Sequence, residues 1–230
     1  MRKLKLKKNR GFTYVELIVV LSIFAIMTSI VIFNYGAYQA KVDIKVLAND
    51  IALQIVQAQK DAMSGKLNTS AALLNIPGWK PSYGVYFFDP GGGHDKDFIY
   101  FTDLNKRGFY DVNNIYSISD CSNVGTSGNE CLKDITLTKG NYIVSLQPYD
   151  TSDAKLPSIK DLSITFIRPN SEAYFYSCGS SSCFSLNDPS SYPQNFSYVQ
   201  ITVASPQSST IKSCIQVYTS GRVQIGQCQP

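Results

Sequence analysis

A carboxylate inside an apolar segment is the first feature with chemical consequences. Glu16 is the single formal charge among the 22 residues from Phe12 to Phe33. An acidic side chain at the centre of a membrane helix costs about 2.5 to 3.5 kcal/mol on insertion scales. We therefore expect a cationic partner for Glu16, because pairing relieves the desolvation penalty of both charges.

Three oxygen-bearing side chains have the outline of a calcium loop. Asp103, Asn105 and Asp111 follow an Asp-x-Asn-x-x-Gly-x-x-Asp pattern, which offers oxygen ligands at alternate positions and a glycine turn. Arg107 occupies the place of the third acidic ligand, and Asn114 that of the bidentate glutamate. These three residues are the calcium candidates, a plain hairpin turn is the alternative, and we expect no other cofactor.

All six cysteines lie beyond the apolar segment. An even number there indicates disulfides formed in an oxidising compartment. Many connectivities remain open, and we favour pairs of sequence neighbours, because each closes a short loop. These pairs are Cys121 with Cys131, Cys178 with Cys183, and Cys214 with Cys228. A zinc cluster is the alternative, but the C-x2-C spacing is missing and His94, the single histidine, is remote in sequence.

Residues for nucleophilic or phosphate chemistry are sparse. The glycine-rich stretch 90–95 lacks the Gly-Lys-Ser/Thr of a P-loop and the G-x-G-x-x-G of a dinucleotide fold, so it is expected to be a surface turn. There is no Gly-x-Ser-x-Gly and no cysteine near a histidine. We expect no catalytic residues and no enzyme. A membrane-tethered enzyme is the alternative if ionisable groups converge in a cleft.

The apolar run predicts a membrane-spanning helix over residues 12–33. At about 1.5 Å per residue it is long enough to cross a hydrocarbon core of about 30 Å. Six basic residues between positions 2 and 10 place residues 1–11 in the cytoplasm and everything after Phe33 across the inner membrane. A secretory signal peptide fits worse, because its apolar region is shorter and no small-residue cleavage site follows.

The segment from Gly11 to Leu17, Gly-Phe-Thr-Tyr-Val-Glu-Leu, follows a short basic leader and opens the apolar helix. It closely resembles the class III signal of type IV pilins and type II secretion pseudopilins. The resemblance implies that a prepilin peptidase cuts between Gly11 and Phe12 and that Phe12 is then N-methylated. It also implies that Glu16 pairs with the terminal amine of a neighbouring subunit in a filament. A plain signal anchor, with Glu16 near the headgroups, is the alternative.

Loss of the leader would change the charge of the working protein. The whole chain has 21 basic and 17 acidic residues, and removing six basic residues leaves 15 against 17. An overall field that attracts nucleic acid or anionic membranes is then absent, and a local basic patch is the alternative.

Apolar periodicity continues past the membrane segment into residues 34–65. No proline interrupts residues 12–64, and Gly65 is the predicted stop, so we expect one helix of about 50 residues. Its second half is expected to lay an apolar stripe on a globular head. The predicted stripe consists of Val42, Val46, Ala48, Ile51, Ala52, Ile55, Val56, Ala58, Ala62 and Met63.

Residues 66–230 change to the pattern of a β head. A linker over residues 66–81, with a short helix around residues 71–74, precedes runs rich in aromatic and β-branched residues. These runs are 83–88, 98–102, 115–118, 135–137, 142–146, 162–167, 173–176, 198–203, 211–218 and 222–225. The expected fold class is α+β, with a pilin-like long N-terminal helix packed on an antiparallel β-sheet or β-sandwich head with disulfides.

Two further segments resemble GspH and FimT-type minor pilins. They are the helical stretch 46–65, with Gln59 at an arginine-like place, and the closing hairpin 211–225. The resemblance implies a head of two small sheets and a structural role as a minor pilin or pseudopilin of a type IV pilus or type II secretion pseudopilus. The implied partners are the major pilin, other minor pilins, the prepilin peptidase and the inner-membrane assembly platform.

DNA binding in a competence pilus is the alternative function. Some FimT-type pilins take part in natural transformation, and a Gly-Arg-x-Arg element in the final hairpin is associated with DNA contact there. This chain has Gly221-Arg222-Val223-Gln224, so one arginine, and about one phosphate contact, is missing. Lys212 and Arg222 are the candidate DNA contacts.

Overall fold

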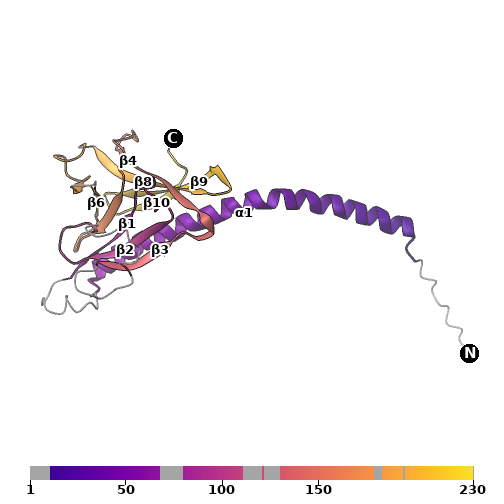
Figure 1. Cartoon of the computed structure of the whole chain (residues 1–230), viewed down its shortest axis with the longest axis horizontal. Helices are drawn as coiled ribbons and strands as arrows, with labels where there is room; N and C mark the ends of the chain where they lie inside the picture. Colours follow the sequence, from indigo (N-terminus) through magenta and orange to yellow (C-terminus); the bar gives the residue numbers. More distant parts are fainter. Residues whose placement is uncertain are drawn as a thin grey trace, which may run out of the picture. The chain divides into compact units, whose positions relative to one another are not determined.

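The computed structural model describes residues 11–67, 80–110, 121, 130–178, 183–193 and 195–229. This part of the chain contains one α-helix followed by ten strands (Figure 1). The elements are α1 (Tyr14–Ser64), β1 (Ser82–Phe87), β2 (Asp97–Asp103), β3 (Cys131–Thr136), β4 (Tyr142–Asp150), β5 (Leu162–Phe166), β6 (Ala173–Cys178), β7 (Cys183–Ser185), β8 (Phe196–Ser205), β9 (Ser208–Tyr218) and β10 (Val223–Gly226).

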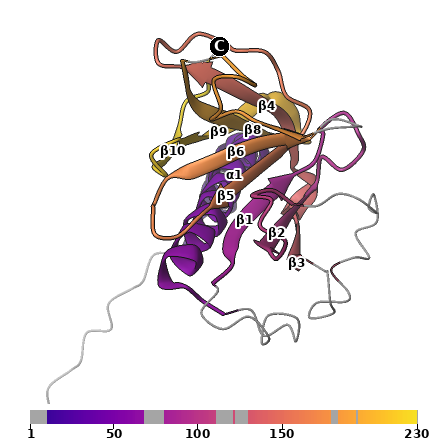
Figure 2. The ribbon, with the colours of Figure 1, turned by 90° about the vertical axis from the view of Figure 1, so that its left-hand side faces the viewer.

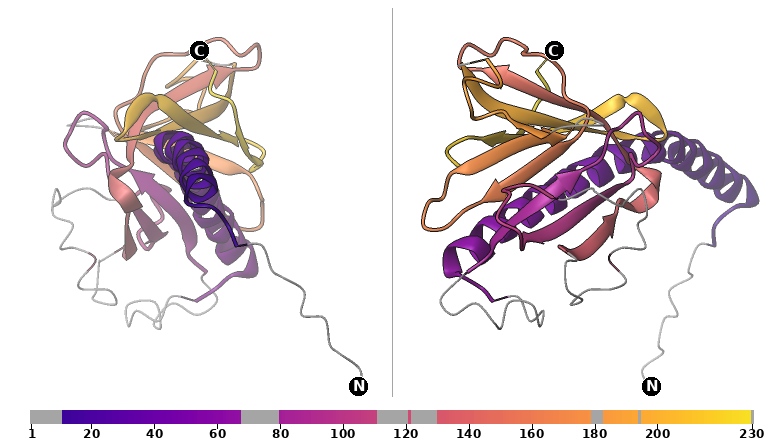
Figure 3. Two further views of the ribbon diagram at one scale, coloured as in Figure 1. Left: turned by 90° about the vertical axis from the view of Figure 1, so that its right-hand side faces the viewer. Right: turned by 60° about the vertical axis from the view of Figure 1, so that its left-hand side comes forward.

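The strands form two antiparallel sheets. The large sheet has the order β3-β2-β1-β5-β6-β7, and the small sheet has the order β10-β9-β8-β4. The chain divides into two compact units, Met1–Ala40 and Lys41–Pro230, so residues 41–64 of α1 belong with the strands. We call Lys41–Pro230 the head unit. Within it, α1 lies against both sheets (Figures 2 and 3).

One face of α1 lies at the centre of the head core. We call this face the inner stripe, whose members are all buried and recur every helical turn: Ile44, Leu47, Ala48, Ile51, Ile55, Ala58 and Ala62. It belongs to the same apolar cluster as Phe87 and Phe98 of the large sheet and Val199 and Ile215 of the small sheet. Side chains from a single helix therefore join the two sheets into one core.

The prediction of which helix face meets the head was partly wrong. Val42, Val46, Val56 and Met63 were expected to face the head, but they are 41–51% exposed. Together with Leu53, which is 61% exposed, they form what we call the outer stripe, a set of apolar side chains outside the buried face of α1. Apolar side chains thus also occur on the exposed side of the helix, between polar ones such as Lys45, Asn49 and Lys60, and three-to-four spacing alone does not tell which of them are packed.

The C-terminus of α1 ends as the sequence predicts. Gly65 adopts a φ of 62°, a left-handed conformation that glycine tolerates best. Its N–H donates to the Ala62 carbonyl at 3.0 Å, and the Lys66 N–H donates to the Asp61 carbonyl at 3.1 Å. This pair of bonds is a Schellman motif, which satisfies helix carbonyls that would otherwise lack partners.

A buried carboxylate ties this helix end to the large sheet. Asp61 accepts hydrogen bonds from Tyr100 on β2 at 2.8 Å, from Lys66 at 2.5 Å and from Gln57 at 2.7 Å. Burial raises the pKa of Asp61, but the hydrogen bonds and the Lys66 charge together outweigh burial. The net pKa therefore lies below its ordinary value.

Nine of the ten predicted strand runs overlap observed strands, and the tenth, residues 115–118, lies outside the described residues. The predicted linker helix at residues 71–74 also lies outside them. Strand β7 was not predicted, because three residues are too few to show a period. The six cysteines form the disulfides Cys121–Cys131, Cys178–Cys183 and Cys214–Cys228, which are pairs of sequence neighbours.

The turn between β9 and β10 is held against α1. The Gln59 side-chain amide donates to the carbonyls of Ser171 at 2.9 Å and Gly221 at 3.2 Å. Gly221 has a φ of 82°, and a Cβ there would lie 1.9 Å from the Ser171 carbonyl oxygen. No side chain fits at this position without moving the backbone.

We predict that Gly221→Ala destabilises the chain by roughly 3–5 kcal/mol, because it combines a left-handed φ with a backbone clash. Thermal unfolding of the full-length chain in a nonionic detergent, followed by near-ultraviolet circular dichroism, measures this loss. Gly226→Ala is the matched control, since a Cβ there meets nothing within 4 Å. Equal stability of the two variants would contradict the prediction.

A second prediction concerns acid stability. The folded-state pKa of Asp61 lies below the ordinary value, so this carboxylate stabilises the fold at neutral pH, and that contribution disappears as the pH falls through the folded-state pKa. Asp61→Asn should cost about 1–3 kcal/mol at pH 7. The deficit relative to the unmodified chain should shrink below about pH 4.

Unfolding curves between neutral and acidic pH check this expectation. Asp50→Asn is the control, because Asp50 is an exposed carboxylate on the same helix. A deficit for Asp61→Asn that stayed constant down to the lowest pH would show that the Asp61 charge does not contribute.

Candidate processing and assembly site

The N-terminus of α1 is closed by a reciprocal pair of side chains. The Glu16 N–H donates to Oγ1 of Thr13 at 3.3 Å. In return, the Thr13 N–H and hydroxyl donate to Oε2 of Glu16 at 3.1 and 2.9 Å. This is a capping box, in which a Thr and a Glu three residues apart satisfy backbone N–H groups at a helix start. The Thr-x-x-Glu spacing is its signal in the sequence, and the expectation of a cationic partner for Glu16 overlooked it.

The capping box uses one of the two carboxylate oxygens of Glu16. Both hydrogen bonds from Thr13 go to Oε2 of Glu16, and no described residue donates to Oε1. An ionised carboxylate has about four acceptor positions, so it can hold the box and accept from a further donor. Phe12, where the predicted cleavage would create an ammonium group, is adjacent to Thr13. Glu16 therefore combines a local structural role with capacity for an external cation.

The helix that follows presents an apolar surface in all directions. Its large apolar side chains from Phe12 to Ile32 are 45–86% exposed. The hydroxyls of Ser22 and Thr28 donate to carbonyls one turn earlier, Ile18 at 2.5 Å and Phe24 at 2.9 Å, so these polar groups are satisfied within the helix. Among the described residues, α1 is the one helix that is long and apolar enough to cross a membrane.

The calcium candidates lie in the turn after β2. The Asp103 carboxylate is buried and accepts from the N–H groups of Arg107 at 3.2 Å and Gly108 at 3.0 Å, while Asn105 accepts from the Arg107 N–H at 3.0 Å. Burial raises the pKa of Asp103, against the effect of these bonds. Asp111 lies outside the described residues. Both described candidates thus brace the loop backbone, and calcium binding stays a prediction.

The glycine-rich stretch 90–95, which includes His94, makes contacts within its own part of the chain. In the glycine-rich stretch, the Gly91 N–H donates to the Asp89 side chain at 2.9 Å and the Gly92 N–H donates to the Asp89 carbonyl at 2.9 Å. The His94 ring lies 5.1 Å from the Phe88 ring. In the parts of the chain that the structure describes, no three His, Cys, Asp or Glu side chains are grouped to hold a metal ion.

The two candidate DNA contacts are far apart. Arg222 places its guanidinium carbon 3.8 Å from the centre of the Tyr218 ring, at the end of β9. Lys212 lies six residues earlier on the same strand, a separation of about 20 Å at the usual strand rise. Between them, the Cys214–Cys228 disulfide attaches the C-terminal tail to the sheet. The structure does not gather the two cations into one patch.

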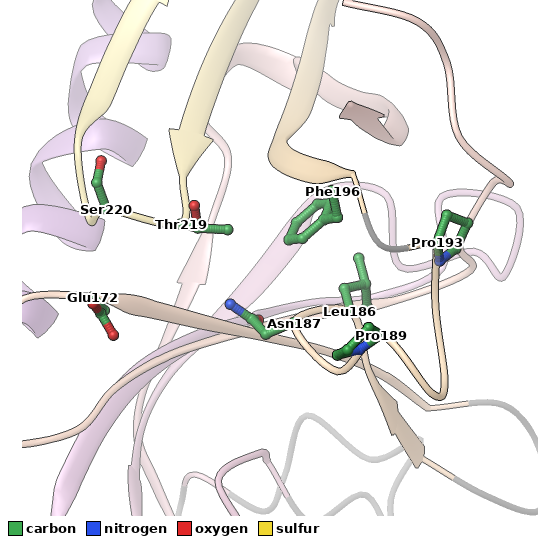
Figure 4. Close-up of a pocket in the computed structure, with 8 residues that line it drawn as sticks. All are labelled: Glu172, Leu186, Asn187, Pro189, Pro193, Phe196, Thr219 and Ser220. Carbon is green, nitrogen blue, oxygen red and sulfur yellow. The ribbon is translucent and has the colours of Figure 1, made fainter. Parts of the chain in front are cut away.

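The head also has a pocket of about 540 Å³, where the β6–β7 hairpin meets the ends of β8 and β9 (Figure 4). Leu186, Pro189, Pro193 and Phe196 supply apolar surface. Asn187 also lines it, but the Asn187 amide is already bonded to β6 backbone groups at 2.7 and 3.1 Å. Among the eight lining residues that the structure describes, Glu172 is the one ionisable side chain.

Comparison with known proteins gives one match. Residues 6–32 match the family model of the prokaryotic N-terminal methylation motif, a type IV pilin-like prepilin signal. No curated protein and no solved structure matches the chain. The matched residues include the predicted cleavage position, Glu16 and most of the exposed apolar part of α1. The motif supports a type IV pilin-like or pseudopilin-like subunit, processed by a prepilin peptidase and anchored in a membrane.

Proposed function

We propose that this chain is a non-enzymatic structural subunit, a minor pilin or pseudopilin of the GspH and FimT type. After removal of residues 1–11 and N-methylation of Phe12, it enters a type IV pilus or a type II secretion pseudopilus through its N-terminal helix. It is held in the inner membrane before assembly, with the head unit outside the cytoplasm. Its partners are the major pilin, other minor pilins and the assembly platform.

The observation that carries this proposal is the methylation motif on an exposed apolar helix whose carboxylate keeps an open oxygen. Glu16 is held by Thr13 through Oε2, and Oε1 has no donor among the described residues. In lipid, an ammonium group of a neighbouring subunit would relieve the remaining desolvation cost. The motif and the geometry therefore favour the same event, pairing between subunits.

The outer stripe gives independent support. Val42, Val46, Leu53, Val56 and Met63 are 41–61% exposed on a helix whose inner stripe is packed in the head. A surface helix that serves only its own head is normally polar on the outside. These side chains lie among exposed polar ones such as Lys45, Asn49 and Lys60, and they add apolar area for helix-to-helix packing beyond the membrane segment.

The GspH and FimT assignment rests on the head. Two sheets of six and four strands suit a two-sheet β-sandwich better than a single meander. The β9–β10 hairpin places Gly221 and Arg222 in its turn, as the resemblance implies. DNA binding has less support, because Lys212 and Arg222 do not form a common patch and Arg222 is stacked on Tyr218.

We predict that the mature protein recovered from cells begins at Phe12 and carries one methyl group on its terminal nitrogen. Mass spectrometry of the N-terminal peptide tests this directly. A Gly11→Val variant should keep the first eleven residues, because the position before the cut would no longer be glycine. Recovery of the unmodified chain with its leader intact would contradict the filament assignment.

We also predict that Glu16→Gln lowers incorporation into filaments about tenfold or more, while the level in the membrane stays unchanged. Glutamine keeps an oxygen that can accept from Thr13, so the capping box survives, but the charge that would pair with an ammonium is lost. Quantitative immunoblots of sheared filament and membrane fractions measure both levels. Asp50→Asn serves as the control, and equal incorporation of the two variants would reject the pairing.

A further inference from the structure

A basic pocket lies at one end of the large sheet, apart from the helix surface used for assembly. It has a volume of about 380 Å³, and nine of the residues that the structure describes line it, of which four are basic and one is acidic. The basic residues are Lys80, Lys106, Arg107 and Arg168. After the predicted loss of the leader the chain has more acidic than basic residues, so this concentration of positive charge is local.

Sheet topology explains why these residues meet. β1 is antiparallel to both β2 and β5, so its first residues lie beside the last residues of its two neighbours: Ser82 pairs with Asp103, and Tyr83 pairs with Phe166. Lys80 precedes β1, Lys106 and Arg107 follow β2, and Arg168 follows β5. Three strand ends therefore deliver their cations to one place.

Two of the cations lie at the C-terminal end of α1, and one of them is hydrogen-bonded to it. Lys80 donates through Nζ to the Gly65 carbonyl at 2.9 Å. Arg168 packs over the same glycine, where an added Cβ would lie 2.7 Å from Nη1. The helix carbonyls offset part of the Lys80 charge. Arg168 keeps its planar set of donors, whose geometry matches phosphate and carboxylate oxygens.

Asp103, the one acidic residue in the described part of the lining, has both carboxylate oxygens engaged by the backbone. Both oxygens of Asp103 accept from loop N–H groups, Oδ1 from Arg107 at 3.2 Å and Oδ2 from Gly108 at 3.0 Å. These bonds fix the loop that carries Lys106 and Arg107. Tyr176 and Ile167 complete the wall with aromatic and aliphatic surface.

We propose that this basic pocket binds a phosphate group carried on a small organic ligand. The cations supply charge-assisted hydrogen bonds to the phosphate oxygens, and Arg168 is suited to a bidentate contact. The walls from Tyr176 and Ile167 contact the organic part, since the pocket is larger than a phosphate ion requires. The head unit thereby has a ligand site built from strand ends, independent of how α1 assembles.

Binding of inorganic phosphate and of glycerol 3-phosphate to the full-length chain in a nonionic detergent tests the proposal. Isothermal titration at constant ionic strength, with chloride as the reference anion, should show one saturable site per chain with a dissociation constant on the order of 1 mM or tighter. Tighter binding of glycerol 3-phosphate is expected if the walls contact the organic part. Glycerol 3-phosphate binding no tighter than inorganic phosphate would reject the wall contact and with it the proposed class of ligand.

Arg107→Gln with Arg168→Gln should weaken binding at least tenfold. Lys133→Gln with Lys160→Gln removes the same charge from exposed positions outside the pocket and should change it less than about twofold. If the first double variant does not fold, Arg107→Gln alone is compared with Lys133→Gln, because Arg107 bonds to Asp103 through its backbone N–H, which glutamine keeps. No saturable binding, or equal losses in both variant pairs, would overturn the proposal.

Discussion

Burial of one face of α1 is the constraint on which the head unit depends. The inner stripe, from Ile44 to Ala62, belongs to one apolar cluster with residues of both sheets. Each fully buried Ile or Leu side chain contributes about 1.5–3 kcal/mol relative to exposure. Without this helix face, the large and small sheets would each lose apolar cover at once. The helix is therefore the central core element of the head, as well as the segment that leads to the membrane.

The same helix carries apolar residues that its own head does not cover. Phe12 to Ile32 is exposed in every direction, and the outer stripe continues apolar surface along residues 42–63. Large uncovered apolar surfaces on a protein mark contact with a membrane or with other proteins. In this chain the first half of α1 fits membrane anchoring, and the outer stripe is the surface proposed to pack against other subunits. One helix thus supplies apolar side chains to the head core and also carries apolar side chains that the head leaves exposed.

Much of this architecture was predictable from the sequence, because it depends on local signals. The length of α1, its end at Gly65 and nine strand runs follow from apolar period, glycine and turn residues. The face of α1 that packs was not predictable for Val42, Val46, Val56 and Met63, since three-to-four spacing does not separate apolar side chains on the packed face from those outside it. Strand β7 was missed because its three residues carry no period.

The candidate sites also differ in whether the sequence alone predicts them. The processing signal is a contiguous motif, and the capping box between Thr13 and Glu16 is predicted by the four-residue pattern Thr-x-x-Glu. The basic pocket has no such pattern, because Lys80, Arg107 and Arg168 come together only through strand order.

The proposed phosphate site lies at strand ends of the large sheet, and this position makes it compatible with the proposed assembly surface on α1. Assembly surfaces on α1 must be continuous and apolar, whereas a phosphate site needs converging cations held by backbone contacts. Antiparallel pairing of β1 with β2 and β5 supplies that convergence at strand ends, where loops carry charged side chains without entering the core. The inner stripe is not interrupted by any of these cations. The residues proposed to bind a ligand therefore lie on loops, apart from the exposed apolar side chains of α1 that are proposed to pack between subunits.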